Sequence, residues 1–156
     1  MIAYNTEFLV TFKLQCRADG ILIPQLRQRW LVIGNLMIDW NYIQQQQKAL
    51  CQKLNINWTP VERDSLIAFN DSLFSSTQPI NGLRHPKKEK MDGWFLWSGG
   101  TFPQDDEKYF KPLHIEHLLE KRPLVLKYLG LPAGWRFQID DLGYEDIWFD
   151  NSILSI

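Results

Sequence analysis

GWFLWSGG at residues 93–100 and AGWRFQIDDLGYEDIWFD at residues 133–150 frame the part of the chain whose fold is easiest to predict. Gly93–Trp97 is a short aromatic run closed by a serine and two glycines, which is typical of a strand that ends in a turn. Trp135–Ile139 and Tyr144–Phe149 are two further runs of this kind, joined by a polar loop at Asp140–Gly143. We therefore predict three strands here, of which the last two form a hairpin.

Two short helices are predicted between these strands. Pro112–Lys121 starts with a proline, which suits the first position of a helix because the N–H there needs no partner. Pro123–Leu129 starts in the same way, and Gly130 follows it as a typical stop signal. A strand, two helices and a hairpin in this order indicate an α+β arrangement.

Further upstream, Asp39 to Leu54 has the pattern of an amphipathic helix. Asp39 is a good N-cap, and the side chains expected on the buried face are Trp40, Ile43, Leu50 and Leu54. The glutamine run at residues 44–47 consists of good helix formers, and we expect it to form a solvated face of this helix.

A second helix start is indicated at Thr59–Glu62. Thr59 and Glu62 have the spacing of a capping box, and Pro60 stands at the first helical position. The apolar stripe that follows is Val61, Leu66, Phe69 and Leu73. This pattern predicts a helix that continues to about Phe74.

Residues 75–92 are polar and contain Pro79, Gly82 and Pro86 before the basic cluster at residues 87–90. Such punctuation predicts an exposed connector. The same stretch divides the chain into an N-terminal half, residues 1–91, and an aromatic and acidic part, residues 92–156.

At the N-terminus, Glu7 to Cys16 alternates apolar and polar residues, which predicts a half-buried strand. Asp19-Gly20 then supplies a turn. Residues 21–33 fit either strands or a helical stripe, and we favour a strand that ends near Ile33. Together these segments predict one α+β domain over residues 1–156, with an antiparallel sheet packed against several short helices.

Composition excludes several classes of protein. A chain of 156 residues with 45% hydrophobic and 22% charged residues suits a soluble globular domain that needs no stabilising metal or disulfide. No apolar run is long enough to span a bilayer, and the start has no basic region typical of a signal peptide. We therefore expect a cytoplasmic protein, with Cys16 and Cys51 as reduced thiols.

Charge is unevenly distributed although the net charge is only −1. Residues 1–91 have 11 Lys and Arg against seven Asp and Glu, whereas residues 92–156 have six against 11. A total close to neutral argues against a dedicated nucleic-acid-binding protein. The acidic part is suited to a basic protein partner, with solvated surface as the alternative.

Candidate catalytic and metal-binding residues are sparse. His114 and His117 have a spacing that some helical metal sites use, but the HExxH motif is absent, and we expect these histidines to form helix or interface contacts. Ser98–Gly100 lacks the lysine of a P-loop, and no local motif supports a Cys–His nucleophile. We therefore predict no catalytic residue, metal or cofactor; a hydrolytic enzyme that uses His114 and His117 is the alternative.

The remaining carboxylate pairs lie in or beside turns, where short acidic side chains commonly accept backbone hydrogen bonds. These pairs are Asp105 and Asp106, Asp140 and Asp141, and Glu145 and Asp146. The chain also has seven tryptophans, and alternation along the predicted strands places large rings on both faces of the sheet. Helices cover both faces, or one face keeps rings that anchor a partner; the sequence leaves both alternatives open.

Residues 93–150 resemble a family of bacterial immunity proteins, the antidotes encoded beside polymorphic or type VI secreted toxins. The resembling stretches are GWFLWSGG, DDEKYF at residues 105–110, KPLHIEHLLEKRPLVLKYLGLPAGWRF at residues 111–137 and GYEDIWFD at residues 143–150. The resemblance implies a small cytosolic α+β protein that binds its cognate toxin and blocks the active site. Residues 1–91 would then be the partner-specific half.

Under this resemblance, an antidote without an export signal implies a toxin that acts in the cytosol. Acidic residues would complement a basic cleft of that toxin, and Trp148 would add an aromatic anchor. The implied partner-binding residues are Asp105, Asp106, Glu107, Asp140, Asp141, Glu145, Asp146 and Trp148. A protein-interaction module with no toxin partner is the second alternative.

Overall fold

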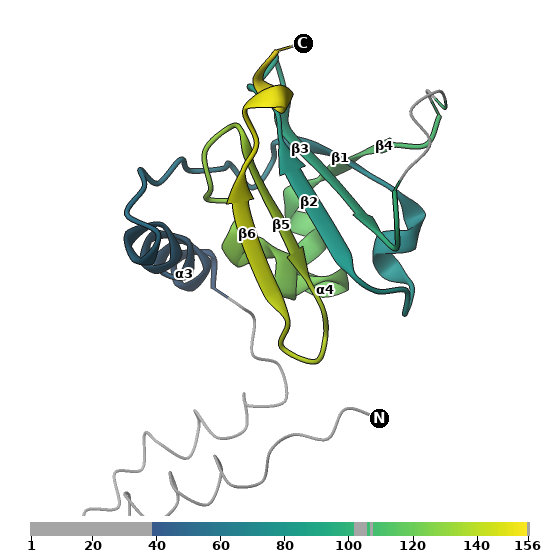
Figure 1. Cartoon of the computed structure of the whole chain (residues 1–156), viewed down its shortest axis with the longest axis horizontal. Helices are drawn as coiled ribbons and strands as arrows, with labels where there is room; N and C mark the ends of the chain where they lie inside the picture. Colours follow the sequence, from purple (N-terminus) through teal and green to yellow (C-terminus); the bar gives the residue numbers. More distant parts are fainter. Residues whose placement is uncertain (1–38, 102–105, 107, 156) are drawn as a thin grey trace, which may run out of the picture. The chain divides into compact units, whose positions relative to one another are not determined.

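The computed structural model of the protein describes residues 39–101, 106 and 108–155, all of which lie in one compact unit, Ile38–Ile156. The strands predicted at residues 7–16 and within residues 21–33 fall outside the described residues, as do Asp105 and Glu107. The described elements are α3 (Trp40–Lys53), β1 (Leu66–Phe69), η2 (Asp71–Phe74), β2 (Ile80–Arg84), β3 (Met91–Ser98), β4 (Lys111–His114), η3 (Ile115–His117), α4 (Leu118–Lys121), η4 (Pro123–Tyr128), β5 (Trp135–Ile139), β6 (Glu145–Phe149) and η5 (Asn151–Leu154), where η denotes a 3-10 helix (Figure 1).

The strands form a six-stranded sheet in the order β4-β1-β3-β2-β5-β6. All neighbours are antiparallel except β1 and β3, which run parallel, so the sheet is mixed. The predicted α+β fold with several short helices is confirmed, whereas the predicted antiparallel sheet was wrong in one pairing, because β1 and β3 run parallel. Strands β1 and β2 come from the part of the chain before residue 91 and lie in the same sheet as β4, β5 and β6.

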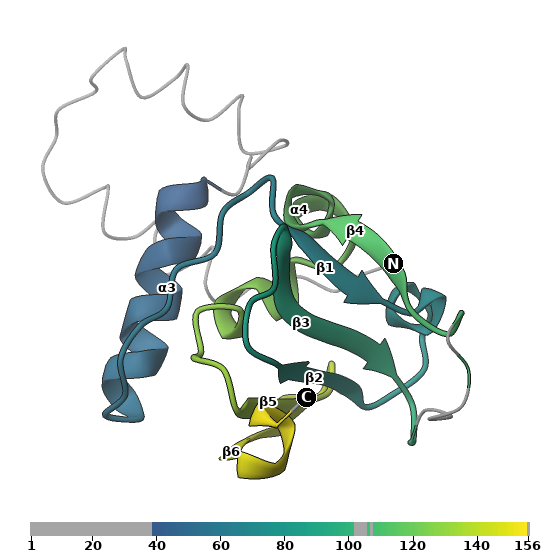
Figure 2. The same ribbon diagram turned by 90° about the horizontal axis from the view of Figure 1, so that it is seen from above.

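The main core lies on the face of the sheet that α3, η4 and α4 cover (Figure 2). Its centre is aromatic: the Tyr128 and Phe137 rings stack with centroids 4.5 Å apart, and Trp94 lies 5.6 Å from Phe137. All three side chains are buried. Burial of each large apolar side chain contributes about 1.5–3 kcal/mol, so this cluster is a main source of stability.

The opposite face of the sheet has a smaller cluster of buried Leu83, Trp97 and Ile153, with Phe95 and Phe110 packed against it. The Phe95 and Phe110 rings meet edge to face at 5.1 Å. The rings of β3 are therefore divided between two packed clusters, as the alternation of a strand predicts.

The helix predicted from Asp39 is confirmed, with one correction. The Asp39 side chain caps α3 by accepting a hydrogen bond from the Asn41 N–H at 3.2 Å, and Ile43 and Leu50 are buried. The prediction of a solvated glutamine face was wrong for Gln47, which is fully buried. Its amide donates to the Leu126 carbonyl at 2.9 Å and therefore joins α3 to η4.

The helix predicted from Thr59 to Phe74 was wrong. Residues 59–65 are irregular and include a turn, Leu66–Phe69 form strand β1, and the single turn η2 follows. The Thr59 N–H, which a capping box would pair with Glu62, instead donates to the Gly130 carbonyl at 2.9 Å, and the Thr59 carbonyl accepts from Arg84 at 3.2 Å. These contacts with distant parts of the chain outweigh the local capping signal.

The exposed connector predicted at residues 75–92 was also wrong, because it contains the buried strand β2. Asn81-Gly82 forms no turn here. A side chain at Gly82 would collide with the Phe137 ring, which lies 2.2 Å from an ideal Cβ, so glycine is required by packing within the sheet. The basic cluster at residues 87–90 is exposed, as expected.

The predicted helix Pro112–Lys121 starts later than expected. Pro112 belongs to the edge strand β4, and helical structure begins at Ile115. Proline is tolerated there because an edge strand needs only one set of backbone partners. The second predicted helix corresponds to η4, and the predicted hairpin corresponds to β5 and β6, so both are confirmed.

Candidate protein-interaction surface

The loop between β5 and β6 is held in one conformation by its own side chains. The Asp140 carboxylate accepts hydrogen bonds from the N–H groups of Leu142 and Tyr144, both at 2.8 Å. Gly143 has a φ of 101°, in the region that favours glycine. The loop therefore presents Leu142 to solvent, and this large apolar side chain is 95% exposed.

A row of side chains follows Leu142 on the face of β6 that points away from the helices. Ile147 packs against the main core, so the alternating residues Asp146 and Trp148, with Tyr144 before them, lie on the opposite face. Tyr144 is 49% exposed, and the Asp146 carboxylate has no hydrogen-bond or ion-pair partner among the described residues. We call Leu142, Tyr144, Asp146 and Trp148 the hairpin surface.

Trp148 is the most enclosed member of the hairpin surface. The Arg136 guanidinium on β5 lies 5.4 Å from the centre of its ring, in a cation–π contact. Arg136 also donates to the Asp150 carboxylate at 2.8 Å. Hydrogen bonds from Ser152 and Arg136 lower the pKa of Asp150 to about 2, so this carboxylate is ionised at neutral pH.

Among the predicted partner-binding carboxylates that the structure describes, Asp141 and Glu145 are bonded to other side chains of the protein. Asp141 accepts from Gln78 at 2.7 Å and from Arg122 at 3.3 Å. Glu145 accepts from Tyr128 at 2.5 Å and from Lys127 at 2.9 Å. Their charges still contribute to the field around the hairpin, and these bonds fix the positions of both carboxylates.

The pKa values near Glu145 follow from these bonds. Burial by itself would raise the pKa of Glu145, but the hydrogen bonds from Lys127 and Tyr128 outweigh burial and hold it below its ordinary value. Burial raises the pKa of Tyr128, and its hydrogen bond to Glu145 raises it further. Glu145 is therefore negative and Tyr128 is neutral at physiological pH.

The hairpin thus brings together Asp140, Asp141, Glu145 and Asp146 from the predicted set. Asp106 belongs to the segment between β3 and β4, where its carboxylate accepts from the Lys108 N–H at 3.0 Å. The sequence did not single out Leu142 and Tyr144. Their position in a loop between two strands, beside Asp and Gly residues, was the available signal.

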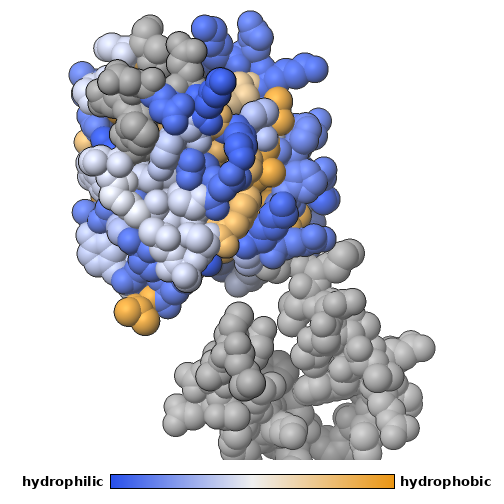
Figure 3. Space-filling view, turned by 90° about the vertical axis from the view of Figure 1, so that its right-hand side faces the viewer, coloured by the Kyte–Doolittle hydropathy of each residue, from blue (hydrophilic) through white to orange (hydrophobic). Residues whose placement is uncertain are grey.

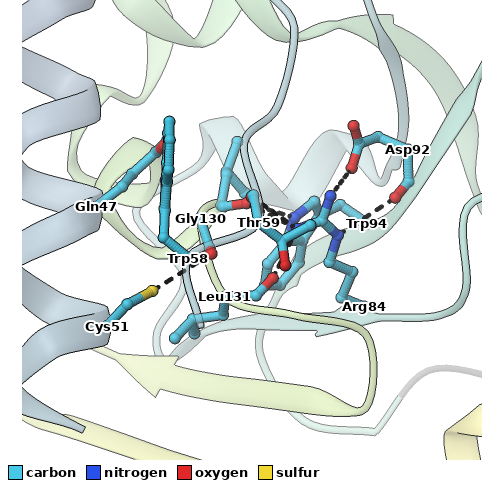
Figure 4. Close-up of polar contacts among 10 residues, drawn as sticks. Gln47, Cys51, Trp58, Thr59, Arg84, Asp92, Trp94, Gly130 and Leu131 are labelled. Atoms are coloured by element: carbon cyan, nitrogen blue, oxygen red, sulfur yellow. Dashed lines mark hydrogen bonds and ion pairs between the residues drawn. The ribbon is translucent and has the colours of Figure 1, made fainter. Parts of the chain in front are cut away.

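A buried ion pair joins Arg84 and Asp92, which the sequence did not reveal as a pair (Figure 4). Arg84 also donates to the carbonyls of Leu131 at 2.6 Å and Leu129 at 3.3 Å. Burial lowers the pKa of Arg84 and raises the pKa of Asp92. The attraction between the two charges opposes both shifts but is smaller than the effect of burial. Because these donors are directed at the chain's own carbonyls, we interpret the cluster as a structural tie.

Cys51 lies beside a shallow pocket of about 320 Å³ that has no histidine in its lining. The lining residues are Lys48, Cys51, Gln52, Asn55, Ile56, Asn57 and Trp58. Its thiol donates to the Gly130 carbonyl at 3.4 Å, and burial raises its pKa, which disfavours the reactive thiolate (Figure 4).

His114 and His117 lie at the end of β4 and in η3, with ring centroids 6.3 Å apart. His114 Nδ1 is 2.8 Å from the Asp64 carbonyl and donates to it. Within residues 39–101, 106 and 108–155, no group of three or more His, Cys, Asp and Glu side chains is arranged to hold a metal ion.

The surface on the β4 side of the molecule differs from the hairpin in how its hydrophobic residues are distributed. On the side of the molecule seen in Figure 3, the described hydrophobic residues appear mainly as a narrow band between hydrophilic ones.

None of the helices in the described part of the chain is long and apolar enough to cross a membrane.

Comparison with known proteins identifies one related family. Residues 46–150 match the model of the Imm33-like domain, which describes an immunity protein family. The match begins within α3 and includes all six strands and the hairpin surface. No curated protein and no solved structure shows significant similarity to the chain. The resemblance predicted over residues 93–150 is confirmed and extends further toward the N-terminus.

Proposed function

The chain belongs to the Imm33-like family of immunity proteins, and from this membership we propose that it binds a cognate bacterial toxin and neutralises it by covering the active site. The protein itself then needs no catalytic residue and no cofactor. Its activity is the exclusion of substrate from another protein.

The observation that carries this proposal is the hairpin surface. Leu142 and Tyr144 are large side chains exposed on a loop that Asp140 holds in place, so little conformational entropy is lost when a partner covers them. Tyrosine and tryptophan are enriched among the residues that contribute most to binding. Tyr144 and Trp148 stand on either side of Asp146, whose charge has no partner in the described part of the chain.

Electrostatics suggest the chemistry of the partner. Residues 92–156 have an excess of acidic residues, and Glu145 and Asp150 on the hairpin stay ionised at neutral pH. A negative surface speeds association with a positive one and selects against partners of the same sign. We therefore propose a toxin with a basic active-site cleft, such as one that acts on nucleic acid or nucleotides in the cytoplasm.

The predicted acidic residues have different roles in this proposal. Asp146 contacts the toxin directly, whereas Asp140, Asp141 and Glu145 hold the hairpin and contribute their charge at longer range. We keep Asp105, Asp106 and Glu107 as a second acidic segment of the binding surface. Delivery of the toxin by a type VI or another polymorphic toxin system is part of the same proposal.

Co-expression tests the function. Cells that express the toxin-like protein that we expect to be encoded beside this gene should survive only when this chain is also expressed. Survival independent of this chain, or no complex between the two purified proteins, would contradict the proposal.

A charge reversal tests the surface. Asp146→Lys should weaken the complex at least tenfold and make affinity less sensitive to salt, with no change in the thermal midpoint. Glu120→Lys is the matched control, because Glu120 is exposed on α4 at the other face of the sheet. Equal effects of the two variants would show that Asp146 makes no specific contact.

A further inference from the structure

The two edges of the sheet differ in how they could receive another strand. β4 has Lys111 and Pro112 in its short length, and proline has no N–H to donate. Lysine and proline are the residues with which edge strands commonly avoid unwanted pairing. β6 has the sequence EDIWF, with neither residue, and pairs with β5 without a bulge.

The backbone groups on the outer side of β6 can be assigned from the ladder. The Asp150 N–H donates to the Gly134 carbonyl at 2.8 Å, and the Asp140 N–H donates to the Tyr144 carbonyl at 3.1 Å. Hydrogen-bonded pairs alternate with non-bonded pairs in an antiparallel ladder. Asp146 and Trp148 therefore bond to β5, whereas the N–H and C=O groups of the intervening residues point outward.

The outward groups belong to Glu145, Ile147 and Phe149. Among the residues that the structure describes, nothing forms a hydrogen bond with the N–H or C=O groups of these three. Figure 1 shows β6 at one end of the sheet, with its outer side facing away from the other five strands. Within the described part of the chain, β6 is therefore an edge strand whose outward hydrogen-bonding groups have no partner.

We propose that the toxin adds a strand to β6, so that backbone hydrogen bonds extend the sheet across the interface. This inference rests on the proposed function and names the part of the surface that would carry it. The hairpin surface would then contact the side chains on one face of the added strand. Phe149, which is 50% exposed, and Ile147 would contact those on the other face.

The side chains beside the edge define the occupant. On the face of the sheet away from the helices, an added strand would lie beside Asp146, whose carboxylate has no partner among the described residues. This favours a lysine or arginine at the facing position. On the helix-covered face it would meet Ile147 and Phe149, which favour apolar residues. The expected occupant is an extended toxin segment that alternates basic and apolar residues.

Residue-by-residue hydrogen exchange gives a direct test. The probe is the toxin-like protein that the proposed function expects from a neighbouring gene, inactivated by substitution of its own catalytic residue. In the free protein the amides of Ile147 and Phe149 should exchange fast, while those of Asp146 and Trp148 are protected by β5. Complex formation should slow Ile147 and Phe149 at least tenfold and leave Asp146 and Trp148 unchanged.

Three outcomes of this experiment would overturn the inference. If the toxin binds but Ile147 and Phe149 still exchange fast, the edge is not used, although the proposed function stands. If both amides are already protected in the free protein, by another part of the chain or by a second copy, the edge is not available. If the toxin does not bind at all, the proposed function fails, and this inference fails with it.

A pair of substitutions at one position separates backbone from side chain. Phe149→Pro removes the outward N–H, and Phe149→Ala removes the ring but keeps that N–H. We expect the proline variant to bind at least tenfold more weakly than the alanine variant, at equal thermal midpoints. Equal affinities would contradict strand addition, and the exchange experiment on the unmodified chain decides the matter if the proline variant does not fold.

Discussion

The Tyr128 hydroxyl donates a hydrogen bond of 2.5 Å to the Glu145 carboxylate and so joins η4 to the edge strand β6. Tyr128 also stacks on Phe137 in the core, with ring centroids 4.5 Å apart. Glu145 is the first residue of β6, directly after the loop that presents Leu142 and Tyr144. The contact therefore fixes the exposed hairpin to the rigid interior, which a preorganised binding surface requires.

The Glu145 contact predicts a pH-dependent stability. The pKa of Glu145 is lowered in the folded protein, so its stabilisation is complete above the unfolded pKa, near 4.5, and is lost as pH falls through the folded value. Glu145→Gln should lower the free energy of unfolding by about 1–2 kcal/mol at pH 7, because a hydrogen bond to a charged group contributes about 1.5–3 kcal/mol and the glutamine oxygen keeps part of it. The difference from the wild type should disappear in acid.

Urea denaturation at pH 7 and at pH 3 measures this difference, with Glu120→Gln on exposed α4 as the control for loss of a negative charge. A difference that is the same at both pH values would show that ionisation of Glu145 does not contribute.

The buried ion pair of Arg84 and Asp92 predicts a larger loss of stability than the Glu145 contact does. Arg84→Ala leaves Asp92 charged in the interior and removes donors from the carbonyls of Leu129 and Leu131. Loss of one partner of a buried ion pair costs about 3–5 kcal/mol. The double variant Arg84→Met with Asp92→Leu should recover part of this loss, because it leaves no unpaired charge. Urea denaturation of the three proteins checks this, and a loss below about 1 kcal/mol in Arg84→Ala would contradict it.

Segments with strong local signals were predicted correctly. The Asp39 cap, the aromatic strand β3 and the β5–β6 hairpin follow from neighbouring residues alone, and the structure contains all three. The carboxylates of the hairpin were found for the same reason, because the turn that contains them was recognised. Whether they bind a partner stays a prediction.

Segments shaped by distant contacts were predicted wrongly. Asn81-Gly82 has the composition of a turn, but Gly82 is required by the Phe137 ring, which is 55 residues away in the sequence. Thr59 has the signals of a helix start, but its backbone is bonded to Gly130 and Arg84. Periodicity and capping cannot detect such partners, because they are defined only when the sheet is assembled.

Arg84 and Asp92 gave a weaker signal that could have been used. Each is a single charged residue within an otherwise uncharged strand, INGLR or MDGWFLWS, and the two have opposite signs. Charged residues are almost never fully buried unless they are paired. Two such strands in succession therefore indicate that they are neighbours in a sheet, as β2 and β3 are.

The burial of Gln47 predicts that substitutions of neighbouring glutamines differ in their effect on stability. Its buried amide donates to the Leu126 carbonyl at 2.9 Å, and its oxygen accepts from the Trp58 indole at 3.2 Å. Gln47→Leu leaves both groups without this partner, which costs about 1–3 kcal/mol. Gln46→Leu is the matched control, since Gln46 is exposed, and should change stability by less than about 0.5 kcal/mol. Thermal denaturation compares them, and equal effects would show that the amide bonds of Gln47 contribute nothing.

The exposure of Leu142 predicts that a substitution there weakens binding without changing stability. A leucine that is 95% exposed contributes almost nothing to the core, so Leu142→Ser should change the free energy of unfolding by less than about 0.5 kcal/mol. If the hairpin enters a toxin cleft, the same change exposes a hydrophobic pocket of the partner and should weaken binding about tenfold or more.

Calorimetric titration with the toxin measures the affinity, and thermal denaturation measures the stability. Leu124→Ser is the matched control, because Leu124 is the same residue type, 39% exposed on η4 at the helix-covered face. It should reduce stability without reducing affinity. A Leu142 variant that binds as tightly as the wild type would exclude the loop tip from the interface, and the toxin contact would then have to lie along β6 itself.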